Sequence, residues 1–162
     1  MVELRGSAGG FGYRFAIIVS RFNEDVTSGL LRGAMRVLND ASVREEDITV
    51  IYVPGAFEIP LVARHAAGTG RFDAIICLGC VIKGETMHFE YIAGSATQGI
   101  ADAAADTGVP MTFGVLTALT DAQALARAAD DDKNKGCEAA GAAVEMATLL
   151  RQLAPLRREA RT

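Results

Sequence analysis

Strand-like apolar runs alternate with helix-like segments along the whole chain, and this alternation constrains the fold more than any other feature. The strand-like runs are residues 15–20, 48–53, 73–78 and 111–116, rich in Val, Ile and Leu. Segments with helical periodicity separate and follow them, at 26–38, 59–67, 89–105, 121–129 and 135–153. Strands joined through helices pair in parallel by right-handed crossovers. The sequence therefore predicts an α/β fold, a three-layer α/β/α sandwich around a four-stranded parallel sheet.

The helix ends carry local signals. Thr27 or Ser28 is expected to cap the first helix, because a side-chain oxygen there can accept a hydrogen bond from an unpaired backbone N–H. Pro60 is tolerated in the first turn of the second helix, where no intrahelical donor is lost.

Length and charge bound the class of protein. The 162 residues fit a single domain, with residues 1–12 expected to form a glycine-rich leader and 154–162 a frayed basic tail. The leader is read either as a flexible segment or as an extra strand on a neighbouring subunit's sheet. The net charge of −4 gives no electrostatic reason to bind nucleic acid. No secretory signal and no apolar run of about 18 residues occurs, which predicts a cytoplasmic protein without a membrane span.

The cysteines predict neither a disulfide framework nor a metal site. There are three, an odd number, so free thiols are expected in a cytosolic protein. Cys77 and Cys80 form a C-x-x-C pattern inside a predicted strand, where an odd separation points the two side chains to opposite faces. Redox pairs of this pattern open a helix instead, and a zinc site would need a second pair.

The candidate site lies where the strands end. All carboxyl ends of a parallel sheet meet at one edge, and open α/β sheets bind ligands there. That edge receives the aromatic rings of Phe22, Phe57 and Phe113 together with the carboxylate of Glu58. Such a pocket suits a planar heterocycle that carries a polyol, next to a phosphate.

The loop after the third strand gives the most specific indication of chemistry at that edge. An apolar run stops at Lys83, and Gly84, Glu85 and Thr86 would then present backbone N–H groups near the start of the next helix, with His88 close by. Amide groups at a helix N-terminus bind anions, and histidine is the side chain that most readily exchanges a proton near neutral pH. Phosphate capture beside a proton donor suggests an enzyme.

Each of these residues also has an ordinary structural explanation. Phe22 can be half-buried packing, and Glu58 opens a helix, where a carboxylate is favoured by the helix dipole whatever the function. His88 can be a solvated helix-start residue, and His65 reads as a surface histidine. Nothing in the pattern itself brings Arg127 or Lys135 to the predicted pocket.

Several separated segments together resemble one family. The segments are RFN after the first strand, PGAFEIP, GCVIKGETMHFEYI, and FGVLT followed by NKGCEAAGAAVEMA. In this order and spacing they resemble lumazine synthase, the penultimate enzyme of riboflavin biosynthesis, from about residue 15 to residue 153. The fold implied is flavodoxin-like.

The resemblance implies a reaction and a set of residues. The family condenses 5-amino-6-(D-ribitylamino)uracil with 3,4-dihydroxy-2-butanone 4-phosphate, without a metal or organic cofactor, to give 6,7-dimethyl-8-ribityllumazine, phosphate and water. By resemblance His88 is the catalytic proton carrier, and the butanone phosphate is bound by Glu85, Thr86 and Arg127. The ribitylaminouracil is bound by Phe22, Ala56, Phe57, Glu58, Cys80, Val81, Ile82, Phe113 and Lys135.

The resemblance also implies partners. The family's site lies between neighbouring subunits of a homo-pentamer, with Phe113 and Arg127 expected from the second chain, and pentamers can assemble further or associate with riboflavin synthase. Shell-forming members often carry glycine in the turn between the last two helices. Here that turn, 129–134, has no glycine and three consecutive acids, so like charges would repel at a contact between pentamers.

Two other classes remain open at this stage. A flavodoxin-like flavin-binding module shares the sheet and the ligand edge, but its phosphate loop normally follows the first strand, where this chain has only Arg21, Phe22 and Asn23. A non-catalytic shell protein would share the fold, but the intact set of candidate residues argues against it.

Overall fold

A four-stranded, all-parallel sheet organises the chain. The computed structural model describes the backbone of residues 1–159 and the side chains through residue 156. The strands lie in the order β2-β1-β3-β4, which confirms the predicted parallel sheet. Their bounds are Phe15–Ser20 for β1, Ile48–Val53 for β2, Ala74–Ile82 for β3 and Met111–Ala118 for β4.

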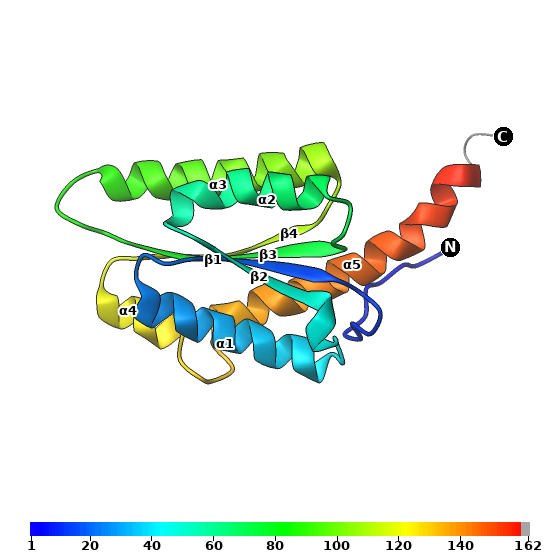
Figure 1. Ribbon diagram of the computed structural model, residues 1–162, viewed down its shortest axis with the longest axis horizontal. Coiled ribbons are helices and arrows are strands. Elements are labelled where there is room, and N and C mark those ends of the chain that lie inside the picture. The colour runs from blue at the N-terminus through cyan, green and yellow to red at the C-terminus, as the bar shows by residue number, and fades with distance from the viewer. Residues whose placement is uncertain (160–162) are drawn as a thin grey trace.

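Helices cover both faces of the sheet, as predicted. Helices α2 and α3 lie over one face, and α1, α4 and α5 lie over the other (Figure 1). Their bounds are Glu24–Asp40 for α1, Ile59–Gly68 for α2, His88–Thr107 for α3, Asp121–Arg127 for α4 and Lys135–Glu159 for α5, with short 3₁₀ turns at Glu45–Asp47 and Ala56–Glu58. Within the described part of the chain, none of the helices has the length and apolar character needed to cross a membrane.

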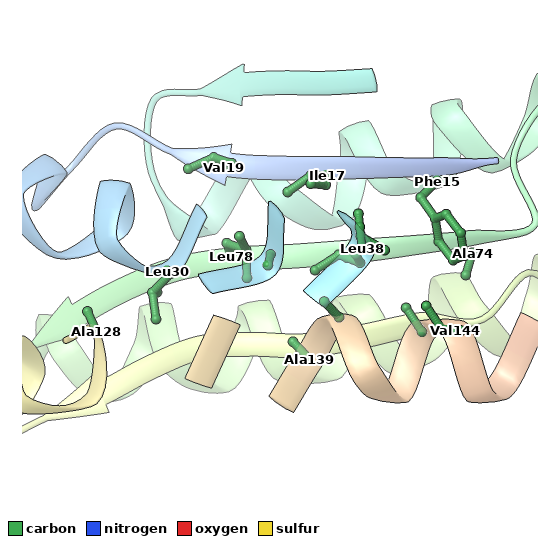
Figure 2. Packing of buried hydrophobic residues seen from close by; sticks show 14 of the residues in the cluster. Phe15, Ile17, Val19, Leu30, Leu38, Ala74, Leu78, Ala128, Ala139 and Val144 are labelled. Atoms are coloured by element: carbon green, nitrogen blue, oxygen red, sulfur yellow. The ribbon is translucent and has the colours of Figure 1, made fainter. Parts of the chain in front are cut away.

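The sheet divides the apolar core into two clusters, because successive side chains of a strand point to opposite faces. Along β1, Phe15, Ile17 and Val19 pack against α1 and α5, as Figure 2 shows, whereas Ala16 and Ile18 pack toward α2 and α3. The cysteines follow the same rule. Cys77 belongs to the α2 and α3 cluster and Cys80 to the other, which confirms the predicted opposite orientation.

Only β1 and β2 have the predicted bounds; among the other elements, α1 begins two residues earlier, β4 ends two residues later and α4 ends two residues earlier than predicted. Strand β3 continues past Leu78 to Ile82, because the buried Gly79 pairs with Val115 of β4 instead of ending the strand. The prediction stopped too early because a glycine commonly breaks a strand. Helix α3 begins one residue earlier than expected, at His88. Helix α5 continues to Glu159, so residues 154–159 of the expected tail are helical; the remainder, 160–162, lies outside the described residues.

The cap predicted for the first helix was wrong. Helix α1 begins at Glu24, and its N-cap is Asn23, which has a left-handed backbone with φ 59°. Asparagine adopts this conformation more readily than other residues with a Cβ. Thr27 is buried within the helix. The chain therefore turns from β1 into α1 directly after Phe22.

The leader has a packing site that the sequence did not predict. The Ser7 amide donates to the Thr148 hydroxyl at 2.8 Å, and the Gln152 side chain donates to the Arg5 carbonyl at 2.7 Å. These contacts place residues 5–7 along α5, near the end of that helix that extends beyond the sheet (Figure 1).

One buried side-chain amide joins three parts of the fold. Asn134 is 1% exposed, and its Nδ2 donates to the carbonyls of Gly29 in α1 and Ala129 in the α4–α5 turn, at 3.0 and 2.9 Å. Its Oδ1 accepts from the backbone amides of Gly136 and Cys137, at 2.8 and 3.3 Å. Asn134 thus caps the start of α5 and fastens that start to α1.

Two glycines make this close approach possible. A Cβ on Gly33 of α1 would overlap the Asn134 side chain, and a Cβ on Gly136 would overlap the Leu30 carbonyl. Any larger residue at either position would push α5 away from α1 and break the hydrogen bonds of Asn134.

We predict that Asn134→Ala lowers the free energy of unfolding by about 2 to 4 kcal/mol, because it removes a helix cap and leaves two backbone carbonyls without their donor. Urea unfolding at equal protomer concentration measures this change. The matched control is Asn39→Ala, at an exposed position of α1, which should change stability little. Equal unfolding curves for the two variants would contradict the role given to Asn134.

Candidate functional site

A pocket of about 340 Å³ opens at the carboxyl ends of β1 and β3, beside the start of α3. It contains six of the candidate residues, from four separate segments of the chain. Its lining is Phe22, Asn23, Ala56, Cys80, Val81, Ile82, His88 and Ile92. We call it the β3 pocket. Its position agrees with the ligand edge predicted for the sheet.

Phe22 is held at the rim of the β3 pocket by backbone contacts on both sides. Its amide donates to the Pro54 carbonyl at 2.9 Å, and its ring lies against Gly55, where a Cβ would come within 2.6 Å. The next residue, Asn23, donates through Nδ2 to the Cys80 carbonyl at 3.0 Å and so ties the end of β1 to β3. The Phe22 ring is nevertheless 67% exposed, which leaves an aromatic surface free for stacking.

Phe57 and Glu58 lie next to the β3 pocket but do not line it. The Glu58 carboxylate accepts a hydrogen bond from the Gly55 amide at 2.9 Å, the reciprocal contact of a helix-start capping box. Within the single chain Glu58 therefore has a structural role, as part of this capping box. Phe57 is more than half exposed.

The loop that carries Glu85 and Thr86 projects beyond the sheet (Figure 1). Gly84, Glu85 and Thr86 are all exposed, and within the described residues their backbone amides donate no hydrogen bond. The Thr86 hydroxyl accepts from the His88 amide at 3.4 Å, and His88 is the first residue of α3. The expected arrangement of free amides beside an imidazole is present, although Glu85 and Thr86 lie outside the pocket lining.

The Cys80 thiol is not suited to act as a nucleophile. Burial raises its pKa to about 11, and the nearby carboxylates of Asp25 and Asp121 add to this increase. The thiol therefore stays protonated at neutral pH, whereas the thiolate is the reactive form. Its contribution to the β3 pocket is packing and a backbone carbonyl.

A second pocket, of about 280 Å³, lies along the outer strand β4, where α4 ends and α5 begins. We call it the β4 pocket; its lining is Phe113, Gly114, Val115, Leu116, Thr117, Arg127, Lys135 and Glu138. Arg127 donates to the Gln123 carbonyl at 3.0 Å, and Lys135 pairs with Glu138 at 2.7 Å. Both cations remain partly exposed toward the pocket.

The structure thus separates the candidate residues into two groups. The β3 and β4 pockets have no lining residue in common. The β3 pocket contains an aromatic ring and the imidazole, and the β4 pocket contains the two cations. Neither pocket alone provides every group that the sequence predicted.

The binding and catalytic residues assigned from the sequence leave out seven residues that line these pockets: Asn23, Ile92, Gly114, Val115, Leu116, Thr117 and Glu138. Asn23 and Ile92 line the β3 pocket, and the other five line the β4 pocket. Asn23 directly follows a buried strand and stands beside Phe22, which was a usable signal. Ile92 lies one turn after His88 on α3, and Glu138 lies three residues after Lys135 on α5, so helical spacing would have found both.

The acidic turn before α5 is partly neutralised by its own chain. Arg32 pairs with Asp130 at 3.3 Å, and Arg36 donates to the Asp131 carbonyl at 3.0 Å. The repulsion expected from three adjacent acids is therefore reduced by two arginines of α1.

Among the described residues, no group of three or more His, Cys, Asp or Glu side chains is arranged to hold a metal ion.

Fold and site together define a class: an α/β protein that binds a small polar or anionic ligand at the carboxyl edge of its parallel sheet. The profile of the 6,7-dimethyl-8-ribityllumazine synthase family matches residues 12–151. Proteins named 6,7-dimethyl-8-ribityllumazine synthase from Salinibacter ruber and Syntrophus aciditrophicus are 51% and 52% identical over 142 residues. The alignments cover 88% of this chain and 91% and 92% of those proteins. The chain belongs to the lumazine synthase family.

Proposed function

We propose that the chain condenses 5-amino-6-(D-ribitylamino)uracil with 3,4-dihydroxy-2-butanone 4-phosphate to give 6,7-dimethyl-8-ribityllumazine, phosphate and water, the penultimate step of riboflavin biosynthesis. The observation that carries this proposal is the family match over nearly the whole chain, at about half identity. The chain is accordingly an enzyme, a transferase. The geometry then suggests what each group does.

The β3 pocket suits the ribitylaminouracil. The exposed Phe22 ring offers a face on which a pyrimidine can stack, and the buried β3 segment from Cys80 to Ile82 forms the wall beside it. Ala56 closes the pocket from the second strand's side, and the neighbouring Phe57 and Glu58 extend the surface toward the ribityl chain. The hydrogen bond that Glu58 accepts from the Gly55 amide occupies one carboxylate oxygen. The other oxygen is available to accept a hydrogen bond from a hydroxyl group.

The amide-rich loop suits the phosphate of the second substrate. The amides of Gly84, Glu85 and Thr86 have no partner in the described chain, and the Thr86 hydroxyl adds another donor. Unpaired donors near the start of a long helix favour an anion. Arg127 would complete this site through a charge-assisted hydrogen bond.

His88 is the residue best placed to move protons. It lies in the β3 pocket lining and begins α3, two residues after Thr86 of the amide-rich loop. Attack of the substrate amine on the ketone forms an imine with loss of water, and loss of the phosphate group follows. Both steps need a proton moved near neutral pH, which an imidazole can do.

Arg127, Phe113 and Lys135 do not line the β3 pocket of their own chain, which supports a contribution from another copy. All three line the β4 pocket, which opens at the outer edge of the sheet. If the β4 pocket of one copy faces the β3 pocket of the next, the two complete a single site. We therefore infer a homo-oligomer with a shared site, with a pentamer as its repeating unit.

The cellular setting follows the family as well. We place the reaction in the cytoplasm and propose that the oligomer associates with riboflavin synthase, because that enzyme consumes the lumazine product. The pairing of Arg32 with Asp130 lowers the charge repulsion at the acidic turn. Electrostatic repulsion at this turn is therefore a weaker obstacle to contacts between pentamers.

The proposed reaction has a direct test. Mixing the purified protein with the two substrates in the presence of a metal chelator should produce lumazine fluorescence, with one phosphate released for each lumazine formed. Activity that is lost with the chelator and restored by zinc would contradict the proposed metal-free chemistry. A yellow protein with stoichiometric bound flavin and no turnover would instead indicate a flavin-binding module.

The proposed role of His88 predicts a specific kinetic change. His88→Ala should lower kcat by roughly 10- to 100-fold with KM little changed, since substrates held together still react slowly without the proton carrier. The chain offers a matched control, because its only other histidine, His65, is exposed on α2 and lies outside both pockets. His65→Ala should keep full turnover. A His88→Ala protein that loses only affinity would make His88 a binding residue.

A further inference from the structure

A third pocket, of about 230 Å³, lies at the end of the sheet opposite to the proposed substrate site. Its residues directly precede or begin the first three strands, so they gather at the amino ends of these strands. We call it the arginine pocket; it is lined by Arg14, Arg44, Glu46, Asp47, Thr49, Arg71 and Phe72. The substrate chemistry proposed above uses none of these side chains.

A buried carboxylate organises the arginine pocket. Asp47 is only 5% exposed, and it accepts from Arg44 Nε at 2.7 Å and lies 3.5 Å from Arg14 Nε. A buried carboxylate needs such partners, since an unpaired charge there would be strongly destabilising. Asp47 thereby draws two guanidinium groups, those of Arg14 and Arg44, to the pocket. Arg44 is fixed further by Glu46 at 2.8 Å.

Arg71 supplies a cation that the pocket's own acids do not neutralise. Within the described part of the chain it forms no ion pair, and its guanidinium carbon lies 5.9 Å from the centre of the Phe72 ring. The lining holds three guanidinium groups and two carboxylates, which leaves one excess positive charge in a chain whose net charge is −4. The exposed Thr49 adds a hydroxyl that has no hydrogen-bond partner among the described residues.

We propose that the arginine pocket binds a phosphate group, either as inorganic phosphate or as part of a small phosphate monoester. Guanidinium groups match phosphate oxygens with paired N–H donors, and the threonine hydroxyl adds a neutral one. The volume exceeds that of one phosphate, and Phe72 gives the extra space an apolar wall. This site is separate from the phosphate position proposed at Thr86 and Arg127, so either assignment can fail without the other.

The experiment uses the full chain with Arg127→Ala, which weakens the phosphate position of the proposed substrate site. Thermal unfolding is followed during titration with sodium phosphate, against sodium chloride at equal ionic strength. A ligand that binds only the folded state raises Tm as its concentration passes Kd. Into this background we would introduce Arg71→Gln and, as the matched control, Arg32→Gln, which removes one arginine of α1 that does not line the pocket. Arg71 forms no ion pair with any described residue, so its replacement should leave folding intact.

We expect phosphate to raise Tm in the Arg127→Ala protein and in its Arg32→Gln version, and Arg71→Gln to weaken the apparent affinity by about tenfold, the loss of one charge-assisted contact. Arg71→Lys should retain part of the effect, because it keeps the charge but not the paired donors. A phosphate response that is the same with and without Arg71, or no response beyond that of chloride, would overturn the proposal. If the phosphate response depends on Arg71, the same titration with ribose 5-phosphate identifies the ligand class. Stronger binding of ribose 5-phosphate than of inorganic phosphate would assign the pocket to phosphate monoesters. Weaker binding would assign it to free phosphate.

Discussion

The buried amide of Asn134 is the contact on which the arrangement of the site depends. Its four hydrogen bonds join α1, the turn after α4 and the first turn of α5, and two glycines let the helices come close enough for them. The start of α5 is consequently fixed beside the outer strand β4. Lys135 and Glu138 lie in that first turn, and Arg127 ends the short helix just before it. Asn134 therefore fixes the start of α5, which carries Lys135 and Glu138 of the β4 pocket.

This placement explains why one chain shows two incomplete pockets. The β3 pocket has an aromatic ring, an imidazole and free amides nearby, but no arginine or lysine in its lining. The β4 pocket has the cations and another aromatic ring, but no histidine in its lining. The β3 pocket lies at the carboxyl ends of β1 and β3, whereas the β4 pocket runs along the outer strand from Phe113, near its start, to Thr117, near its end. Under the proposed shared site, an assembly that brings unlike pockets of neighbouring copies together would supply the set of groups that the reaction needs.

The local sequence pattern was sufficient to predict the layers of the fold, but it was not sufficient to predict much of the site. The alternation of strand and helix predicted the parallel sheet, and the odd spacing of Cys77 and Cys80 predicted their opposite faces. The end of β3 could not be predicted, because its last residues are held by pairing with β4, which lies about 35 residues further along the chain. The cap at Asn23 was missed because the left-handed turn that permits it is a backbone property. Arg127 and Lys135 could be assigned only by resemblance, since no periodicity within one chain brings them to Phe22.

The central claim, that two copies share one site, is tested most directly by mixing two inactive variants. Arg127→Ala removes a group from the β4 pocket and His88→Ala removes one from the β3 pocket, so in a mixed assembly some interfaces combine two intact pockets. Lumazine formation is measured after subunit exchange, with exchange itself followed by fluorescence energy transfer between labelled copies. The account predicts activity well above that of either variant alone. No gain in activity, despite demonstrated exchange, would contradict a shared site.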